Sequence, residues 1–190
     1  MSSSTDLPRR RLSPAQAETV AKLCAAVPAT LAEHGVDGFT VRLAARAAGV
    51  SPATAYTYFS SKNHLIAEVF ARRVESELVE PDPSAPPRER VLQVLDGLVE
   101  LVLTDPQFAT AVNTALLGHE ADAQAVRLRI GLLLRARLTE ALGRGAPSGL
   151  VESVELAYSG VLVQAGMGYL DVVASKAALA RAVDLMMPIR

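Results

Sequence analysis

The stretch from Thr40 to Ser61 constrains the fold of this chain more than any other part of the sequence. It holds two short runs of helix-compatible residues, separated by Gly49-Val50-Ser51. Thr40 and Ser51 are hydroxyl residues of the kind that cap helix starts, and Pro52 stands at a first helical position, where its missing N–H costs no hydrogen bond. Two short helices joined by a three-residue turn form a helix-turn-helix, in which the glycine allows the tight turn.

A longer helix is expected before this motif. Ser13-Pro14 starts it, and Gln16 completes a capping box. Apolar residues continue at helical spacing to Gly35, which is a suitable end cap. Pro28 lies inside this helix and removes one backbone hydrogen bond, so we expect a kink or a break near residues 24–28.

After the motif, the pattern predicts only helices. Ser61 caps one that runs to about Val79, and the four prolines between Pro81 and Pro87 form the clearest linker. Asp105-Pro106, residues 143–148 and Ser175 mark further boundaries. The helices expected beyond the linker cover about residues 87–104, 106–117, 120–142, 148–173 and 175–187.

The expected fold is therefore all-α, with about nine helices. A disordered basic tail over residues 1–12 precedes a three-helix helix-turn-helix module over 13–60 and a helical body over 61–190. The composition agrees, because half of the residues are hydrophobic and Ala, Leu, Val and Arg dominate. A chain of 190 residues is long enough to bury a core and to enclose a cavity.

The charge is distributed unevenly along the chain. Up to Arg73 there are nine Lys and Arg against five Asp and Glu, whereas the remainder has ten against fifteen, and the whole chain carries a formal net charge of -1. An excess of this size arises by chance in many chains. Its position on the helix-turn-helix half suits binding to a polyanion.

Residues 39–62, FTVRLAARAAGVSPATAYTYFSSK, resemble the DNA-binding signature of the TetR family. The matching positions are Thr40, Ala45, Ala48, Gly49-Val50-Ser51, Thr54, Tyr56, Tyr58-Phe59 and Ser61-Lys62, and Ala32-Glu33-His34-Gly35 extends the resemblance to about residues 13–75. Leu43-Ala44, Ala53 and Ala55 depart from the family pattern. The resemblance implies a DNA-binding transcriptional regulator, most often a repressor, that works as a homodimer on a palindromic operator.

The candidate DNA-binding residues follow from both arguments. Ala55 and Phe59 fall on the buried side of the expected recognition helix, which leaves hydroxyls, methyls and rings facing outward to fit a major groove. By resemblance, Thr40, Tyr58 and Lys62 contact phosphates. The full candidate set is Thr40, Arg42, Ser51, Pro52, Ala53, Thr54, Tyr56, Thr57, Tyr58 and Lys62, with Tyr56 alternatively part of the core.

The resemblance also implies that the body encloses a cavity for a small apolar effector. Candidate lining residues combine apolar walls with a few polar groups: Phe108, Asn113, Leu117, His119, Tyr158, Leu162, Gln164 and Met167. Small residues on the penultimate helix, namely Ala157, Gly160, Gly166 and Gly168, favour a homodimer seam built from the last two helices. The alternative is that these helices are the central core of a monomer.

Several classes of protein have no support in the sequence. Glycine-rich phosphate loops, paired metal-binding histidines and nucleophile motifs are missing, so we expect no enzyme, metal or cofactor. His119 is expected at the surface, and Cys24 is expected to be a small buried hydrophobe. Without a membrane-length apolar run or a secretory signal, we expect a cytoplasmic protein.

Two other functions remain open. A helical small-molecule carrier or enzyme with a vestigial helix-turn-helix is the main alternative, and DNA binding distinguishes it from the regulator. A constitutive regulator that responds to a protein partner, or to no ligand, is the other.

Overall fold

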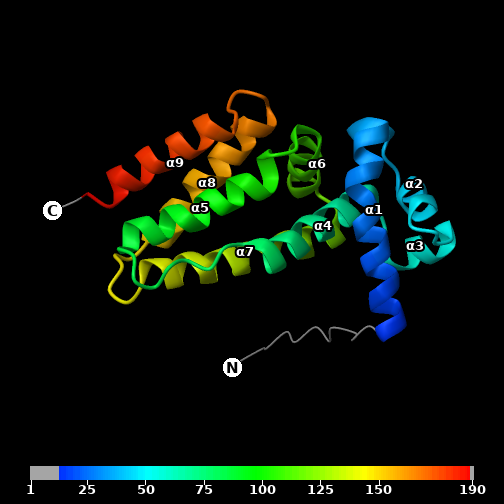
Figure 1. The fold of residues 1–190 in the computed structure, drawn as a ribbon, viewed down its shortest axis with the longest axis horizontal. Coiled ribbons are helices and arrows are strands. Elements are labelled where there is room, and N and C mark those ends of the chain that lie inside the picture. The colour runs from blue at the N-terminus through cyan, green and yellow to red at the C-terminus, as the bar shows by residue number, and fades with distance from the viewer. Residues whose placement is uncertain (1–12, 189–190) are drawn as a thin grey trace.

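The structure is a computed structural model that describes residues 13–188, and within this range it is all-α, as the sequence predicts (Figure 1). Its helices are α1 (Pro14–Gly38), α2 (Val41–Ala47), α3 (Pro52–Tyr58), α4 (Lys62–Glu77), α5 (Pro87–Leu103), α6 (Pro106–Leu117), α7 (Ala121–Leu142), α8 (Leu150–Gly166) and α9 (Val172–Met186). The tail expected over residues 1–12 lies outside the described residues.

Helices α1, α2 and α3 form a small unit at one end of the molecule, which we call the head (Figure 1). Helices α5 to α9 form the body, in which α5, α7, α8 and α9 run along the long axis (Figure 1). Helix α4 packs against α1 on one side and against α6 and α7 on the other, so it joins the two parts. The main contacts between the head and the body are those of α4, those between α1 and α6, and the hydrogen bond from Ser60, before α4, to Asp122 of α7.

The expected break in α1 is at a different residue. The helix is not interrupted at Pro28, and its non-helical backbone lies at Gly35, with φ 68° and ψ 172°. A break near residues 24–28 is therefore wrong and the alternative, a kink at Pro28, stays a prediction, whereas Gly35 does mark the end of the regular helix. A left-handed φ is readily available only to glycine, and the carbonyl of Gly35 accepts a hydrogen bond from the amide of Phe39.

The boundary between the last two helices also differs from the prediction. Helix α8 ends at Gly166, where Gly168 takes φ 81° and the amide of Tyr169 donates to the carbonyl of Gln164. This is a glycine C-cap, although apolar residues continue past it and suggest a longer helix. Asp171, not Ser175, caps α9, by accepting a hydrogen bond from the amide of Ala174.

Two of the small residues on α8 have roles within the chain. A Cβ placed at Gly166 would lie 1.6 Å from Nδ2 of Asn113, so this glycine lets α6 approach α8, and Nδ2 of Asn113 donates to the carbonyl of Leu162. Gly168 provides the turn after α8. Gly160 is exposed on α8, with no atom within 4 Å of a Cβ placed there.

One hydrophobic core continues from the head into the body. Three of the four phenylalanines, Phe39, Phe70 and Phe108, are fully buried, and they come from the end of α1, from α4 and from α6. The guanidinium of Arg73 on α4 lies 5.0 Å from the centre of the Phe108 ring, an arrangement that adds a cation–π attraction between α4 and α6. The head and the body are therefore packed together through α4.

Candidate nucleic-acid interface

Helix α3 starts at a well-formed cap. The hydroxyl oxygen of Ser51 accepts a hydrogen bond from the amide of Thr54 at 3.1 Å and lies 2.8 Å from the Thr54 hydroxyl. Gly49 takes φ 67° and makes the turn from α2, and the amide of Val50 donates to the carbonyl of Ala45. Local interactions therefore fix where α3 begins and how it leaves the turn.

The outward face of α3 carries most of the predicted residues. Ala55 and Phe59 are buried, as predicted, and hold the helix against the core. Ser51, Pro52, Ala53, Thr54, Tyr56 and Thr57 are exposed on the other side. This face is small, uncharged and rich in hydroxyl and methyl groups, so it can enter a groove and contact base edges.

Of the two tyrosines of α3, Tyr56 lies where the sequence prediction places it, whereas Tyr58 does not. Tyr56 is 49% exposed, so it lies on the surface, not in the core. Tyr58, which we expected to face outward, is half-buried and packs against the hydrophobic core. Tyr56 is therefore more accessible to a partner than Tyr58.

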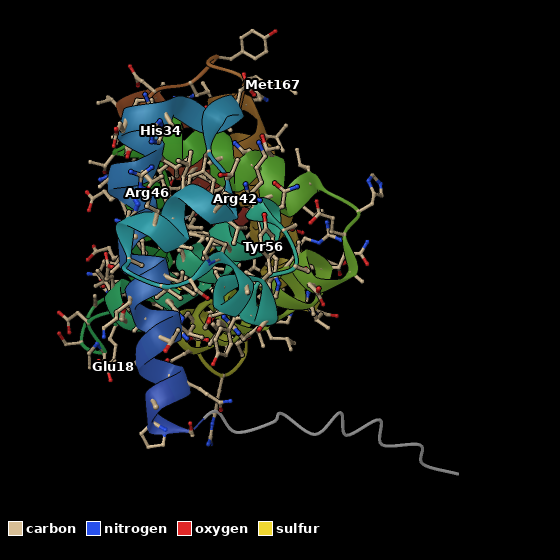
Figure 2. The ribbon with its side chains drawn as sticks, turned by 90° about the vertical axis from the view of Figure 1, so that its right-hand side faces the viewer. Glu18, His34, Arg42, Arg46, Tyr56 and Met167 are labelled. Atoms are coloured by element: carbon tan, nitrogen blue, oxygen red, sulfur yellow. The ribbon has the colours of Figure 1, made fainter. Side chains whose placement is uncertain are left out.

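Positive charge accompanies α3 on the same end of the head. Thr40 caps α2 through a hydrogen bond from the amide of Leu43 to its hydroxyl, and Arg42, the second residue of α2, is exposed. Figure 2 shows Arg42, Arg46 and Tyr56 on the end of the molecule that faces the viewer. Arg46 was not among our candidates, although its spacing of four residues from Arg42 on one helix face was a usable signal.

Lys62 has a partner inside the protein. Its ammonium donates a hydrogen bond to the carbonyl of Val36 at 3.1 Å, and the side chain is half-buried. This contact ties the first residue of α4 to the backbone that follows Gly35 in α1. Phosphate binding by Lys62 stays a prediction, and it would require the ammonium to share or leave this carbonyl.

The eight predicted effector residues separate into two groups. Phe108, Tyr158 and Leu162 are buried and Asn113 is half-buried, whereas Leu117, His119, Gln164 and Met167 are exposed. In Figure 2 Met167 lies at the upper edge of the molecule, away from Tyr56. Tyr158 is the most informative of the set, because its buried hydroxyl has no hydrogen-bond partner among the described residues.

Burial raises the pKa of Tyr158 well above its ordinary value, so its hydroxyl is neutral at any physiological pH. The hydroxyl of Ser175 on α9 is likewise buried without a partner in the described part of the chain. Buried polar groups are nearly always hydrogen-bonded, so two such hydroxyls on adjacent helices mark places where a polar group of a ligand or a water would bind.

A groove of about 640 Å³ lies between α7 and α8. Leu128, Leu132 and Leu156 contribute apolar surface, and charged residues including Arg127, Arg135 and Glu152 stand at its rim. None of the eight predicted effector residues lines it. Sequence reasoning missed this groove, because the exposed leucines of α7 look like part of an ordinary helical core stripe.

Two further side-chain predictions concern Cys24 and His119. Cys24 is buried, as expected, and burial raises the pKa of its thiol to about 12. His119 is exposed, as expected. In the range 13–188 no three His, Cys, Asp or Glu side chains gather in a way that would hold a metal ion, and no helix has the length and hydropathy that a membrane crossing requires.

Comparison with known proteins agrees with this geometry. The profile described as "Bacterial regulatory proteins, tetR family" matches residues 25–69. An uncharacterized HTH-type transcriptional regulator of Mycobacterium tuberculosis is 46% identical over 155 residues, which cover 80% of this chain and 73% of that protein. The HTH-type transcriptional repressor KstR of Rhodococcus jostii is 28% identical over 137 residues, which cover 70% of this chain and 64% of that protein.

Solved structures share the fold. A TetR transcriptional regulator from Rhodococcus sp. RHA1 superposes with a TM-score of 0.74 at 21% identity, covering 90% of this chain and 97% of that one. The transcriptional regulator FadR of Bacillus subtilis, solved in complex with stearoyl-CoA, gives a TM-score of 0.57 at 20% identity, covering 90% of this chain and 99% of that one.

The exposed recognition helix on a capped helix-turn-helix, joined to a helical body, defines the class of this protein as a DNA-binding transcriptional regulator. The chain belongs to the TetR family of these regulators. The family assignment that the sequence resemblance suggested, and the all-α fold with it, are confirmed.

Proposed function

We propose that this protein is a repressor that binds a near-palindromic operator as a homodimer and is released from it by a small, largely apolar effector. The observation that carries the proposal is the uncharged, exposed face of α3, which stands beside Arg42 and Arg46. Such a face can read bases in the major groove while the arginines contact phosphates. Repression as the output is supported by the name of the KstR relative.

The division of labour within the head is expected to follow the side chains. Thr54 and Thr57 are exposed on the outward face of α3, so they are proposed to contact base edges. Arg42 and Arg46 carry charge, so they are proposed to contact phosphates. The half-buried Tyr58 is proposed to present its hydroxyl to the backbone from the edge of the interface.

The first test is a fluorescence titration of the purified protein with duplex DNA from the region upstream of its own gene, at two salt concentrations. If a dimer neutralises about six to ten phosphates, affinity should fall on the order of a thousandfold between low and moderate salt. A scrambled duplex of the same length is the control. If the affinity does not change with salt, a small-molecule carrier is favoured instead. The same holds if both duplexes bind equally and a genome-wide selection also finds no preferred sequence.

A pair of substitutions tests the roles of the two groups. Arg42→Ala should weaken binding to operator and scrambled DNA by a similar factor and reduce the salt dependence, whereas Thr54→Ala should mainly weaken operator binding. Identical profiles for the two variants would contradict the proposed division.

The homodimer is proposed to form through α8 and α9. Gly160 faces open space, and Leu156 one turn before it is 68% exposed, so the outer side of α8 can receive another helix closely. Val173 and Leu185 on α9 add exposed apolar surface. An isologous contact of these two helices would set two copies of α3 about one helical turn of DNA apart.

Sedimentation of a charged variant tests the seam. Leu156→Glu should raise the monomer fraction, because it buries an unpaired charge in the contact. Leu117→Glu, at an exposed apolar residue of α6, is the matched control. If Leu156→Glu leaves the dimer unchanged, the seam lies elsewhere.

The effector is proposed to bind in the body near Phe108, Tyr158 and Leu162, with the hydroxyl of Tyr158 bonded to a polar group of the ligand. Three features support this region: apolar walls, the half-buried amide of Asn113 and the unpartnered Tyr158 hydroxyl. The complex of FadR with stearoyl-CoA supports an apolar ligand with a polar end. Tyr158→Phe should weaken release of the operator by such ligands, screened as acyl-CoA thioesters of increasing length, and leave operator binding unchanged.

A further inference from the structure

The turn between α3 and α4 is bonded to the beginning of α7. The hydroxyl of Ser60 donates to Oδ2 of Asp122 at 2.5 Å, and Nδ2 of Asn63 donates to Oε1 of Glu120 at 2.8 Å. The hydroxyl of Ser61 donates to the other oxygen of Glu120. Two donors of the turn and one from the first turn of α4 are therefore held by two carboxylates of the body.

The turn that carries the two serine donors is directly connected to α3 on one side and to α4 on the other. The hydroxyl oxygen of Ser61 also caps α4, by accepting from the amide of His64. Phe59, the residue after α3, is buried, and its ring meets the His64 ring edge-to-face at 5.4 Å. Glu120 and Asp122 therefore bond to the segment that lies between the buried end of α3 and the first turn of α4.

A second set of contacts holds α4 to α7 farther from the head. Nη2 of Arg129 lies 2.8 Å from Oε2 of Glu68, and its Nε lies 3.1 Å from Oε1 of Glu75. Glu68 also accepts from Nε of Arg72 at 2.8 Å. Helices α4 and α7 are therefore joined at two levels, and the first level is the one that reaches the turn after α3.

We propose that Glu120 and Asp122 are positioning residues, which hold α3 at the angle that operator recognition requires and pass displacements of α7 to it. This proposal rests on the proposed function. The corner that carries them is itself fixed to α6, since Nη1 of Arg127 donates to the carbonyl of Leu116 at 2.6 Å. A ligand that moves α6 or the start of α7 would pull on the turn between α3 and α4.

The two carboxylates also carry negative charge near the proposed DNA-binding end. Removing this charge changes DNA affinity in the opposite direction to loosening the turn. Removing a negative charge would strengthen binding to all DNA alike. Loosening the turn would weaken binding only where α3 must fit a particular sequence. The ratio of operator affinity to scrambled-DNA affinity at one salt concentration cancels the first effect and retains the second.

The experiment measures this ratio for full-length variants, with an operator selected using the wild-type protein. Glu120→Ala combined with Asp122→Ala should lower the ratio about tenfold through loss of preorganisation. Glu120→Gln loses the same charge as Glu120→Ala but keeps one acceptor oxygen, so its ratio should fall less. Glu140→Gln, at an exposed position near the other end of α7, is the control and should leave the ratio unchanged.

A double-mutant cycle from the head side tests whether the effect runs through the turn. Ser60→Ala and Asp122→Ala should each lower the ratio, and the combined variant should lower it no further, because both remove the same hydrogen bond. Additive effects, equal ratios for Glu120→Ala and Glu120→Gln, or a ratio that stays at the wild-type value would overturn the proposal.

Separate measurements distinguish a loosened turn from a failure to fold and from a failure of the proposed function. Amide exchange of residues 53–58 in the free protein should accelerate several-fold in the double-alanine variant while exchange in α8 and α9 is unchanged. If that variant does not fold, Ser60→Ala and Glu120→Gln carry the test alone. If the wild-type protein selects no operator, the proposed function fails, whereas wild-type selectivity with unchanged variants contradicts only the positioning role.

Discussion

The head and the body start their helices in different ways. Each helix of the head, and α4 after it, begins at a side chain that accepts a hydrogen bond from the backbone: Ser13, Thr40, Ser51 and Ser61. In the body, α6 and α9 also begin at such caps, Asp105 and Asp171, but α5, α7 and α8 begin at Pro86, Glu120 and Gly149 with no such bond. Every helix start in the head is thus fixed by a capping side chain, whereas three of the five helix starts in the body depend on packing.

This difference suits the two tasks. A recognition surface needs one fixed geometry, which caps, a left-handed Gly49 and a buried Phe59 provide. A sensing body must be able to change, and the unpartnered hydroxyls of Tyr158 and Ser175 are the kind of feature that a rigid core avoids. Four substitutions or reactions test this contrast, from the largest expected effect to the smallest.

Phe39→Ala should lower the free energy of unfolding by about 3–5 kcal/mol, because the ring is fully buried at the junction of α1 and α2 and its loss leaves a cavity. Urea denaturation followed by circular dichroism measures it. Tyr56→Ala, at an exposed ring of the same head, should change the value by less than about 0.5 kcal/mol. A small effect of Phe39→Ala would mean that caps alone hold the head together.

Alkylation of Cys24 tests how tightly α1 is closed against its neighbours. Because burial raises the thiol pKa from about 9 to about 12, its thiolate fraction at pH 8 should be about a thousandfold below that of the unfolded chain. Burial of the neutral thiol therefore contributes fully to stability below pH 9. Above pH 9 the thiol of the unfolded chain ionises, and this contribution is lost as the pH rises toward 12. The rate of iodoacetamide labelling, measured with and without urea, gives the ratio of thiol reactivity in the unfolded and folded states. Comparable rates in the two states would show that the head opens readily.

Two glycines of α8 form a matched pair for the body. Gly166→Ala should destabilise the protein by about 1–3 kcal/mol, because its Cβ would overlap the Asn113 side chain and displace the bond to Leu162. Gly160→Ala has open space and should raise monomer stability by about 0.5–1 kcal/mol through helix propensity. Thermal melts at several protein concentrations compare them. A dimer weakened by Gly160→Ala would locate close helix packing at that residue.

Thr40→Ala should lower the free energy of unfolding by about 1 kcal/mol, since it removes the cap of a seven-residue helix. Thr110→Ala, at an exposed hydroxyl that bonds within α6, is the control from the body and should stay within about 0.5 kcal/mol of the wild type. Equal effects at the two positions would remove the distinction between a capped head and a packed body.

The structure follows the sequence prediction most closely where local chemistry decides. The starts of α1, α2, α3 and α4 fall at the predicted caps, and Ala55 and Phe59 are buried as predicted. The failures concern interactions across the fold: Pro28 is accommodated inside α1, and α9 begins three residues earlier than its expected boundary at Ser175. An apolar run does not show where a chain must turn to meet another helix.

By itself, the sequence determined the all-α class, the helix-turn-helix and most of the residues that α3 exposes, because caps, a glycine turn and helical periodicity act over a few residues. Only the tertiary structure decided that Gly166 leaves room for α6, that Lys62 donates a hydrogen bond to the carbonyl of Val36, and that Glu120 and Asp122 bond to the segment at the start of α4. Those contacts join residues far apart in the chain, and their partners are set by how helices pack, which no local pattern records.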